Sequence, residues 1–422
     1  MLVYVLNKEG SPLMPCSSAK ARKLLKDGKA KIIKRDIFTI QLLYGSSGYK
    51  QEITLGVDTG SKTIGLSATT KSNELFAGEY QLRNDISDLL SDRRIYRRAR
   101  RNRKTRYRKA RFLNRVRTKN KGWLAPSVEH KIESHINIID KIHKILPIQK
   151  LVVELANFDI QKINNPDIKG KDYQFGEAYG FENIKSYVLF RDNYTCQHCK
   201  GKSKDSKLHV HHIIFRSQGG SDNVDNLICL CKTCHDKLHK NQIKLNTKGL
   251  KKIHKDSTFM NIMKNTLINR LKLRYENLEI TYGYITKQNR YDNSIDKTHR
   301  FDALTISGNF KASPLSYVFY MRKARCQNRQ IHKAKILKGG IRKLNQAKYE
   351  VFNYRLFDKV VFESSEYFIF GRRSSGFFDI RNLEGVKVNK GSISCKKLKL
   401  ILPKKNILIE MREGNSSTTL NG

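Results

Sequence analysis

The chain is poor in acidic residues. Its 38 Asp and Glu stand against 83 Lys and Arg, which gives a formal net charge of +45 over 422 residues. No apolar run reaches transmembrane length, and the first ten residues, M-L-V-Y-V-L-N-K-E-G, include an acid and no cleavage-like site. We therefore expect no membrane partner. The charge excess predicts a polyanionic partner, although ribosomal-type proteins are equally basic, so charge alone does not separate them from nucleases.

A disulfide framework is also missing. Cys16, Cys229, Cys326 and Cys395 are scattered singly along the chain. This distribution is typical of a protein that is kept in a reducing cytosol, so we expect a cytoplasmic location.

The other four cysteines form two C-x-x-C pairs, Cys196 with Cys199 and Cys231 with Cys234. Four thiolates at this spacing suit tetrahedral Zn²⁺ with no open coordination position, which marks a structural site. Cys229 lies two residues before Cys231 and is a competing ligand, but only Cys231 completes a pair. Four unrelated core cysteines are the alternative explanation.

Histidines lie between and after the two cysteine pairs. His211 and His212 are adjacent, so on an extended strand they point to opposite sides, and one can bind a metal while the other faces a substrate. His235 and His239 are four residues apart and share one face of a short helix. A single histidine is more often an ordinary surface residue, but this order between and beside two cysteine pairs resembles the HNH (ββα-metal) endonucleases.

The HNH resemblance implies a role for each residue. His212 would be the general base that deprotonates the attacking water, and Asn226 would orient it. His211, together with His235, His239 or both, would hold a divalent metal, Mg²⁺ or Mn²⁺, that stabilises the scissile phosphate and the leaving oxygen.

A second candidate site comes from three separated segments. I-T-L-G-V-D reads as a strand that ends at Asp58, before a glycine turn, and L-V-V-E reads as a buried strand that ends at Glu154. T-H-R-F-D places His299 and Asp302 on one face of a helix. A carboxylate that closes an apolar strand costs free energy unless it is paired or binds metal. The three carboxylates therefore suggest a two-metal hydrolase site that uses Mg²⁺ or Mn²⁺.

Each segment alone has an ordinary explanation: a sugar-kinase-like phosphate turn, a salt-bridged strand end, and a helix surface. In this order, with the HNH pattern between the second and the third, they resemble a RuvC nuclease of the RNase H fold that is split in three. This arrangement is shared by the IscB proteins and the type II CRISPR effector nucleases.

Residues 92–117 form a very basic segment. Fourteen of them are Lys or Arg, none is Pro or Gly, and the single acid, Asp92, can cap a helix. A helix of this length spans about 39 Å, enough to follow several phosphates, and its self-repulsion predicts that it orders on a polyanion. The alternatives are a solvated basic helix and a localisation tract, but its position resembles the IscB bridge helix, which contacts the guide RNA. The predicted contact residues are Arg93, Arg97, Arg101, Lys104, Arg108, Arg111 and Arg115.

The first fifty residues carry the most specific string. Pro12-Leu13-Met14-Pro15 reads P-L-M-P, the signature for which the N-terminal domain of IscB is named. It is followed by a capped basic helix that stops at Gly28 and then by a strand, which predicts a small βαβ-like RNA-binding module. Together with the other motifs of the chain, this string indicates that the chain resembles the IscB family.

From Lys348 onward the sequence alternates in short apolar segments. Six short strands over about 65 residues predict a small β-barrel. In IscB the matching region reads a short motif beside the target, so Arg372, Arg373 and Arg381 are candidate nucleic-acid contacts. Ordinary surface arginines are the alternative. The tail from Gly414 has the composition of a disordered segment.

The expected fold is a multidomain α/β protein with a RuvC core of the RNase H-like fold split in three, an inserted HNH domain with a zinc ribbon, an arginine-rich bridge helix and a small C-terminal β-barrel. We expect an N-terminal domain at 1–50, RuvC segments at 51–91, 118–184 and 246–312, the bridge helix at 92–117, the HNH domain at 185–245, a basic connector at 313–347 and the C-terminal domain at 348–422.

The resemblance implies an RNA-guided DNA endonuclease that is associated with mobile elements of the IS200/IS605 type. HNH would cut the strand paired with the guide, and RuvC would cut the displaced strand. Expected partners are a structured guide RNA (omega RNA) and double-stranded DNA with a short flanking motif, in a monomeric ribonucleoprotein near the prokaryotic nucleoid. The alternatives are a protein-only, structure-specific endonuclease and a basic RNA-binding protein with vestigial nuclease folds.

Overall fold

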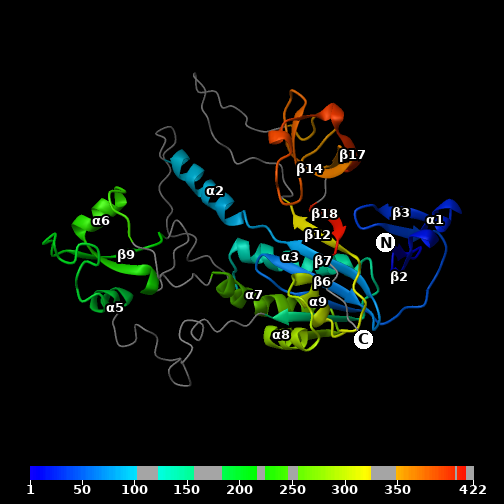
Figure 1. Ribbon diagram of the computed structural model, residues 1–422, viewed down its shortest axis with the longest axis horizontal. Helices are drawn as coiled ribbons and strands as arrows, with labels where there is room; N and C mark the ends of the chain where they lie inside the picture. Colours follow the sequence, from blue (N-terminus) through cyan, green and yellow to red (C-terminus); the bar gives the residue numbers. More distant parts are fainter. Residues whose placement is uncertain are drawn as a thin grey trace. The chain divides into compact units, whose positions relative to one another are not determined.

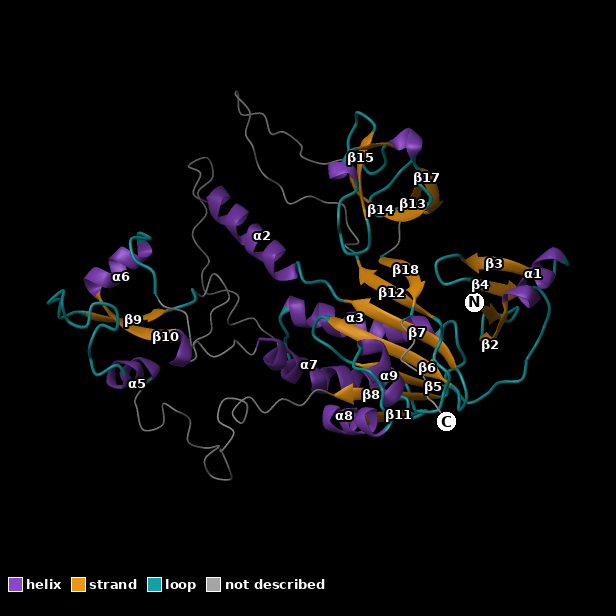
Figure 2. Ribbon diagram, viewed as in Figure 1, coloured by secondary structure: helices purple, strands orange, loops and turns teal. Residues whose placement is uncertain are grey.

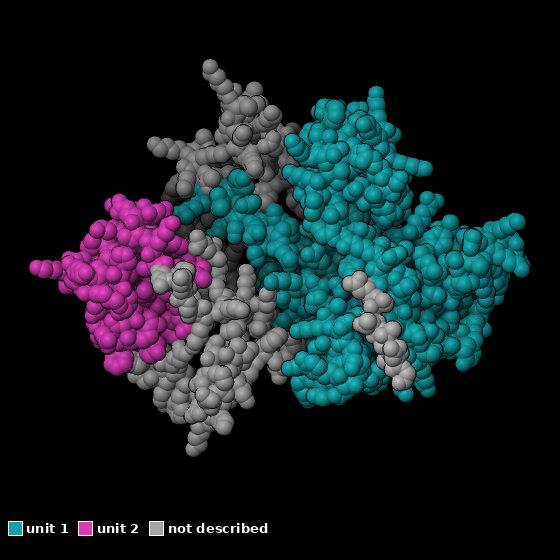
Figure 3. Space-filling model, in the orientation of Figure 1, with its two compact units in different colours: residues 1–157, 259–422 teal, residues 158–258 magenta. Residues whose placement is uncertain are grey.

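The computed structural model describes residues 1–101, 122–155, 183–215, 224–245, 255–324, 348–403 and 406–414. The chain forms two compact units, Met1–Asn157 with Phe259–Gly422, and Phe158–Thr258 (Figure 3). Both units mix helices and strands, in agreement with the expected α/β class. Within the described ranges, no helix is both long enough and apolar enough to cross a membrane.

The larger unit is built on a seven-stranded sheet (Figures 1 and 2). In spatial order its strands are β11 (Leu278–Tyr282), β8 (Lys150–Leu155), β5 (Thr54–Asp58), β6 (Thr63–Thr69), β7 (Glu74–Gln81), β12 (Tyr317–Lys323) and β18 (Ile407–Glu413). The strands β5, β6 and β7 form an antiparallel meander, and β8 and β11 continue the sheet parallel to β5. At the other edge β12 pairs parallel with β7, and β18 pairs antiparallel with β12.

One face of this sheet carries the main apolar core. Alternate residues of a strand point to the same face, and Leu55, Val57 and Val153 are almost fully buried on it. The helices α3 (Pro126–His143) and α7 (Lys255–Lys272) contribute isoleucines, methionines and leucines at helical spacing to the same cluster. Pro126 stands at the first helical position of α3, where its missing N–H costs nothing.

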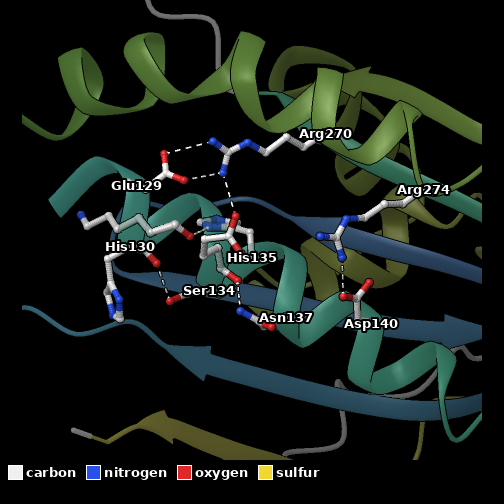
Figure 4. A network of polar contacts seen from close by, with 10 residues as sticks. Glu129, His130, Ser134, His135, Asn137, Asp140, Arg270 and Arg274 are labelled. Atoms are coloured by element: carbon white, nitrogen blue, oxygen red, sulfur yellow. Dashed lines mark hydrogen bonds and ion pairs between the residues drawn. The ribbon is translucent and has the colours of Figure 1, made fainter. Parts of the chain in front are cut away.

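Ion pairs join α3 to α7 beside this core. Arg270 of α7 lies 2.6 Å from Glu129 and 2.7 Å from Glu133, and Arg274 lies 2.8 Å from Asp140 (Figure 4). All these side chains are partly exposed, so each pair contributes at most about 1 kcal/mol. Their main effect is to fix how the two helices lie along each other.

The helix α9 (His299–Ile306) packs on the opposite face of the sheet, and two glycines of the sheet allow the helix backbone to approach closely. A Cβ on Gly56 of β5 would lie 2.1 Å from the carbonyl oxygen of Ala303, and a Cβ on Gly65 of β6 would lie 1.9 Å from that of His299. The helix backbone therefore rests directly on the two strands. The helix α8 (Gly283–Asp292) packs beside α9 and also contacts β8 and β11.

The N-terminal module has four strands and one helix. These are β1 (Leu2–Leu6), β2 (Pro12–Ser17), α1 (Ser18–Lys26), β3 (Ala30–Lys34) and β4 (Thr39–Leu42), with the strand order β2-β1-β4-β3. The P-L-M-P string opens β2. Ser17 caps α1 by accepting from the Lys20 N–H at 3.3 Å, and Gly28, at φ +66°, follows the helix end as expected.

The C-terminal region differs from the expected six-stranded barrel. Its strands β13 (Lys359–Phe362), β14 (Ser365–Arg372), β15 (Phe377–Arg381), β16 (Ile393–Ser394) and β17 (Lys399–Leu402) form a sheet of order β16-β15-β14-β13-β17, with two edges; the short 3₁₀ turns Asn389–Gly391 and Cys395–Lys397 flank β16. The expected sixth strand, β18, joins the seven-stranded sheet instead. Ile407 and Ile409 bury into the main core and Leu408 packs against Phe368 on the other side, so both faces of β18 are covered.

The basic helix α2 spans Ile86–Arg101, so it begins six residues before the expected start at Asp92. Residues 86–91 continue the helical sequence without Pro or Gly, and Asp92 lies inside the helix rather than at its cap. Residues 102–121, which hold Lys104, Arg108, Arg111 and Arg115, lie outside the described residues, as does the side chain of Arg101.

The smaller unit contains α5 (Ile184–Arg191), β9 (Leu208–His212), a 3₁₀ turn (Val224–Asn226), β10 (Leu227–Cys231) and α6 (Lys232–His239). The strands β9 and β10 pair antiparallel, with His212 opposite Leu227, and α6 follows directly. This is the strand–strand–helix order that the sequence predicts for the histidine site.

We expect Gly56→Ala to destabilise the larger unit by about 1–3 kcal/mol, because the new methyl group collides with the α9 backbone rather than with a flexible side chain. Thermal unfolding measures this loss. The matched control is Gly45→Ala at an exposed site with nothing within 4 Å of the added carbon. Equal melting temperatures for the two variants would contradict the close contact.

Candidate functional site

The four paired cysteines form one cluster in the smaller unit. The thiols of Cys196, Cys199, Cys231 and Cys234 all lie within 4.8 Å of one another. The Cys199 and Cys231 sulfurs are 3.8 Å apart, and a tetrahedral Zn²⁺ with Zn–S bonds of about 2.3 Å places its sulfurs about 3.8 Å apart. The cluster therefore fits a closed zinc site.

Cys229, the competing ligand, lies elsewhere. It is fully buried and absent from the cluster, and burial raises the pKa of its thiol to about 11, so it is neutral. Its backbone N–H donates to Asp192 Oδ2 at 2.8 Å, and Arg191 in turn holds Asp192 and donates to the Leu227 carbonyl. This pair joins the end of α5 to β10.

The three candidate metal-binding histidines also meet. The ring nitrogens of His211, His235 and His239 approach within 4.8 Å of one another, and the ring centroids lie 4.5 to 5.1 Å apart. His211 is only 5% exposed, and its Nε2 is buried without a hydrogen-bond partner. Burial, followed by the three neighbouring histidines, lowers the pKa of His211 to about 4, so its lone pairs stay available to a cation. An orphaned buried nitrogen facing two further imidazoles fits a metal ion.

The candidate base and its neighbour lie at the end of the same strand pair. His212 is half-buried and follows His211 on β9, so the two rings leave the strand on opposite sides. Asn226 is 5% exposed; its Oδ1 accepts from the Ile214 N–H at 2.9 Å and its Nδ2 donates to the Ile214 carbonyl at 3.0 Å. The amide thus fixes the backbone two residues beyond His212.

The larger unit brings the four candidate residues of the second site to one face of its sheet. Asp58 follows Val57, which pairs with Val153, so Asp58 and Glu154 end neighbouring parallel strands. His299 Nδ1 lies 2.6 Å from Asp58 Oδ2, across 241 residues of sequence. Asp302 is one helical turn further along α9.

These carboxylates act on one another electrostatically. Burial, and then the charges of Asp58 and Asp302, raises the pKa of Glu154 to about 7, although the nearby Thr286 hydroxyl opposes the shift. Burial and the Asp58 charge also raise the pKa of Asp302. A cluster of buried carboxylates that resist losing their protons fits a bound cation.

The three carboxylates are more spread out than the cysteine and histidine clusters. Among the described residues, the sets of three or more ligand side chains within 4.8 Å of one another are those two clusters. The three carboxylates are thus not gathered around one point. A two-metal site does not need all its ligands around one point, because its two ions lie about 3.5–4 Å apart.

Supporting residues around this site were not foreseen from the sequence. Arg290 of α8 is 9% exposed, and its Nε lies 3.2 Å from Asp302 Oδ1. The turn after Asp58 is held by Lys131, whose Nζ donates to the Ser61 carbonyl at 2.6 Å, and by Thr59, whose hydroxyl donates to the Glu154 carbonyl. No motif marks these contacts, although the glycines in T-L-G-V-D and T-I-G-L could have indicated a close helix.

The C-terminal arginines are engaged inside their own sheet. Arg372 donates to the backbone carbonyls of Lys348 and Tyr354, both at 3.1 Å, and Arg373 donates to that of Gly391 at 3.2 Å. Arg381 pairs with Asp379 at 2.6 Å. These contacts favour the structural alternative for all three.

Two protein families match the sequence. Residues 3–176 match the family described as RRXRR protein, and residues 196–241 match the HNH endonuclease family. An RRXRR domain followed by an HNH domain is consistent with an IscB-type protein. The first match includes α2, where residues 97–101 read R-R-A-R-R. The second covers all four cluster cysteines and the three clustered histidines, and it identifies a metal-dependent endonuclease domain in this chain.

Relatives share parts of the chain. Anaredoxin of Nostoc sp. (strain PCC 7120 / SAG 25.82 / UTEX 2576) is 38% identical over 67 residues, 16% of this chain and 86% of its own length. The type IV methyl-directed restriction enzyme EcoKMcrA of Escherichia coli (strain K12) is 36% identical over 63 residues, which cover 13% of this chain and 22% of that enzyme.

Solved structures show only a distant likeness. Streptococcus thermophilus Cas9 in complex with the AGAA PAM has 13% identity and a TM-score of 0.33, and the match covers 61% of this chain and 32% of that one. The type II-C Cas9 of Actinomyces naeslundii has 10% identity and a TM-score of 0.25, with 63% and 60% covered. The chain thus spans about a third of the former and three fifths of the latter, and the likeness is too weak to define a shared fold.

Removal of the cluster metal should unfold the smaller unit, because binding free energy at such a site is folding free energy. We expect Cys234→Ser, or chelation of the wild-type protein, to release zinc and to expose residues 183–245 to limited proteolysis. Cys395→Ser, outside the cluster, should change neither zinc content nor proteolysis. Protection that survives metal loss would contradict a structural role.

His135 of α3 should make the larger unit sensitive to acid. It is fully buried behind the Asp58 turn, its Nδ1 lies 2.8 Å from the Lys131 carbonyl, and burial lowers its pKa from 6.5 to about 4. The unfolded chain therefore binds the proton first, and stability falls as pH drops from about 6.5 through 4, by roughly 3 kcal/mol. The variant His135→Gln should be less stable at neutral pH but should lose less of its free energy of unfolding over that range. Parallel pH profiles for the two proteins would exclude this linkage.

Proposed function

We propose that this protein is an IscB-type, RNA-guided DNA endonuclease with two separate nuclease centres. The observation that carries the proposal is the convergence of Asp58, Glu154, His299 and Asp302, from three distant segments, on one face of a sheet in a chain that also contains an HNH domain. This convergence supports a RuvC core split in three. A single-domain HNH nuclease would not need it.

The HNH centre is proposed to cut the strand that is paired with the guide. His212 accepts the proton of the attacking water, and Asn226 holds the backbone beside it through Ile214. The histidines 211, 235 and 239 would hold a divalent cation, which when bound would offset negative charge on the scissile phosphate and leaving oxygen. The four-cysteine zinc site fixes β10 and the start of α6, and thereby the spacing of these histidines.

The RuvC centre is proposed to cut the displaced strand. Asp58, Glu154 and Asp302 would hold the cations, for which we propose Mg²⁺ or Mn²⁺. Asp58 orients the His299 ring through Nδ1, which leaves Nε2 to exchange a proton with the reacting water. Arg290 lies 3.2 Å from Asp302, and its charge opposes the rise in the pKa of Asp302 that burial and the Asp58 charge cause.

The net charge of the chain and its similarity to the IscB family lead us to propose RNA and DNA as its partners. The net charge of +45 and the basic helix α2, with exposed Arg93 and partly exposed Arg97, support a long RNA as the first partner. We propose that α2 belongs to the bridge helix expected at 92–117, of which residues 102–117 lie outside the described residues. The protein would read the shape of the guide–target duplex and a short flanking motif, and base pairing would read the sequence.

A substitution in one nuclease centre should abolish the cut made by that centre and leave the other cut unchanged. His212→Ala should abolish cutting of the paired strand alone, and Asp58→Ala should abolish cutting of the displaced strand alone, each by at least about a hundredfold because a reacting group is removed. Duplex DNA with a different label on each strand measures both cuts in one reaction, and each variant is the control for the other. Loss of both cuts in either variant would refute the division of labour.

RNA guidance has its own test. The protein purified from its host should carry a structured RNA, and cleavage of a DNA that matches this RNA should need Mg²⁺ and should stop after RNase treatment. Cleavage that continues without RNA would indicate a protein-only, structure-specific endonuclease. Binding of RNA without cleavage under any ion would indicate a structural RNA-binding protein.

A further inference from the structure

The two proposed nuclease centres offer different donor atoms. The HNH cluster presents three imidazole nitrogens and no carboxylate among its members, whereas the RuvC centre presents carboxylate oxygens. Imidazole suits zinc, nickel, copper and iron, whereas carboxylate and water suit magnesium and manganese. We infer that the histidine centre binds a nitrogen-preferring transition ion of the Zn²⁺ class and not Mg²⁺, so that the supply of two ions decides which strand is cut.

The cluster is prepared to bind through nitrogen. His211 Nε2 is buried with no hydrogen-bond partner, and the Nε2 atoms of His235 and His239 face each other at 3.3 Å. On the far side of the His235 ring, Nδ1 lies 3.6 Å from Asp236 Oδ1. A carboxylate beside the outer ring nitrogen favours the proton at Nδ1 and leaves the lone pair on Nε2, an arrangement that is common around zinc-bound histidines.

The surroundings also disfavour magnesium. Phe215 packs edge-on against His211 with ring centroids 5.2 Å apart, and it contacts His239 at 5.6 Å. Mg²⁺ sheds its water reluctantly and demands near-octahedral oxygen coordination. Three nitrogen ligands beside a phenyl ring would not compensate for the water that the ion loses. A Zn²⁺-class ion with three nitrogen ligands keeps one open position, the arrangement of a catalytic rather than a structural site.

The oxygen centre has the opposite preference. Asp58, Glu154 and Asp302 are the donors there, and no cysteine or histidine cluster involves them. His299 is occupied by its 2.6 Å contact with Asp58. Millimolar Mg²⁺ would therefore load the RuvC centre and leave the HNH centre unfilled.

Metal counting tests the inference without relying on activity. The full-length protein, stripped of metal, is titrated with Co²⁺ and then challenged with a roughly thousandfold excess of Mg²⁺. We expect two tightly bound Co²⁺ per chain in the wild type, one with the sulfur-to-metal charge-transfer band of the cysteine cluster and one without it. His239→Ala and His235→Ala should each lose only the second, and Mg²⁺ should displace neither.

A matched control separates the cluster from its neighbours. His209 stacks on His235 at 5.1 Å but lies outside the cluster, so His209→Ala should keep both ions. The persisting sulfur band shows that the variants remain folded. Displacement of the second Co²⁺ by Mg²⁺, or an equal Co²⁺ count in wild type and His239→Ala, would overturn the inference.

The strand-cutting consequence rests on the proposed function and has a separate readout. With the matching RNA and DNA, Mg²⁺ alone should give a nick in the displaced strand, and added Zn²⁺ should restore the second cut. Full double-strand cutting in Mg²⁺ purified free of trace metals would contradict the ion selectivity. A protein that cuts neither strand, yet binds two Co²⁺, would refute the proposed function and leave the metal assignment standing.

Discussion

The contact between the α9 backbone and two glycines is the constraint on which the larger unit depends. Gly56 and Gly65 lie on adjacent strands and remove the side chains that would keep the helix at ordinary distance. Because α9 then rests on β5 and β6 themselves, His299 reaches Asp58 directly. A buried ion pair holds the same helix: Arg300 lies 2.6 Å from Glu74, and both are nearly inaccessible to water. Breaking such a pair from one side leaves an uncompensated charge, so the pair also fixes one arrangement of the helix against its alternatives.

The two centres obtain their rigidity in different ways. The carboxylate centre lies on a large sheet with a continuous apolar core beneath it, and its geometry follows from strand register and helix packing. The histidine centre belongs to a small unit whose hydrophobic cluster consists largely of the cysteines themselves. A Zn²⁺ ion held by the four thiolates would add stability that so small an apolar cluster does not supply.

Local chemistry was predictable from the sequence, and tertiary contacts were not. The C-x-x-C pairs, the i, i+4 histidines and the strands that carry Asp58 and Glu154 are short-range patterns. The structure gathers the cysteines and the histidines into two clusters and places Asp58 and Glu154 on neighbouring parallel strands. The partners of these groups come from distant segments without motifs: Arg290 beside Asp302, and Asp192 beneath Cys229. The early start of α2 was missed because a capping residue was preferred to six helix-compatible residues before it. The placement of β18 was missed because I-L-I is apolar on both faces, a pattern of a covered strand rather than of an alternating barrel strand.

The position of β18 bears on how this protein is made. The strand comes near the end of the described chain, yet it lies beside β12 in the sheet that carries the carboxylates, and it buries Ile407 and Ile409 in the main core. A ribosome releases residues in order, so that core lacks Ile407 and Ile409 until β18 has emerged. Until then β12, which pairs with β7 on its other side, lacks its second neighbour. The unpaired edge of β12 can associate with other chains during that interval, and the high net charge of the chain opposes such association.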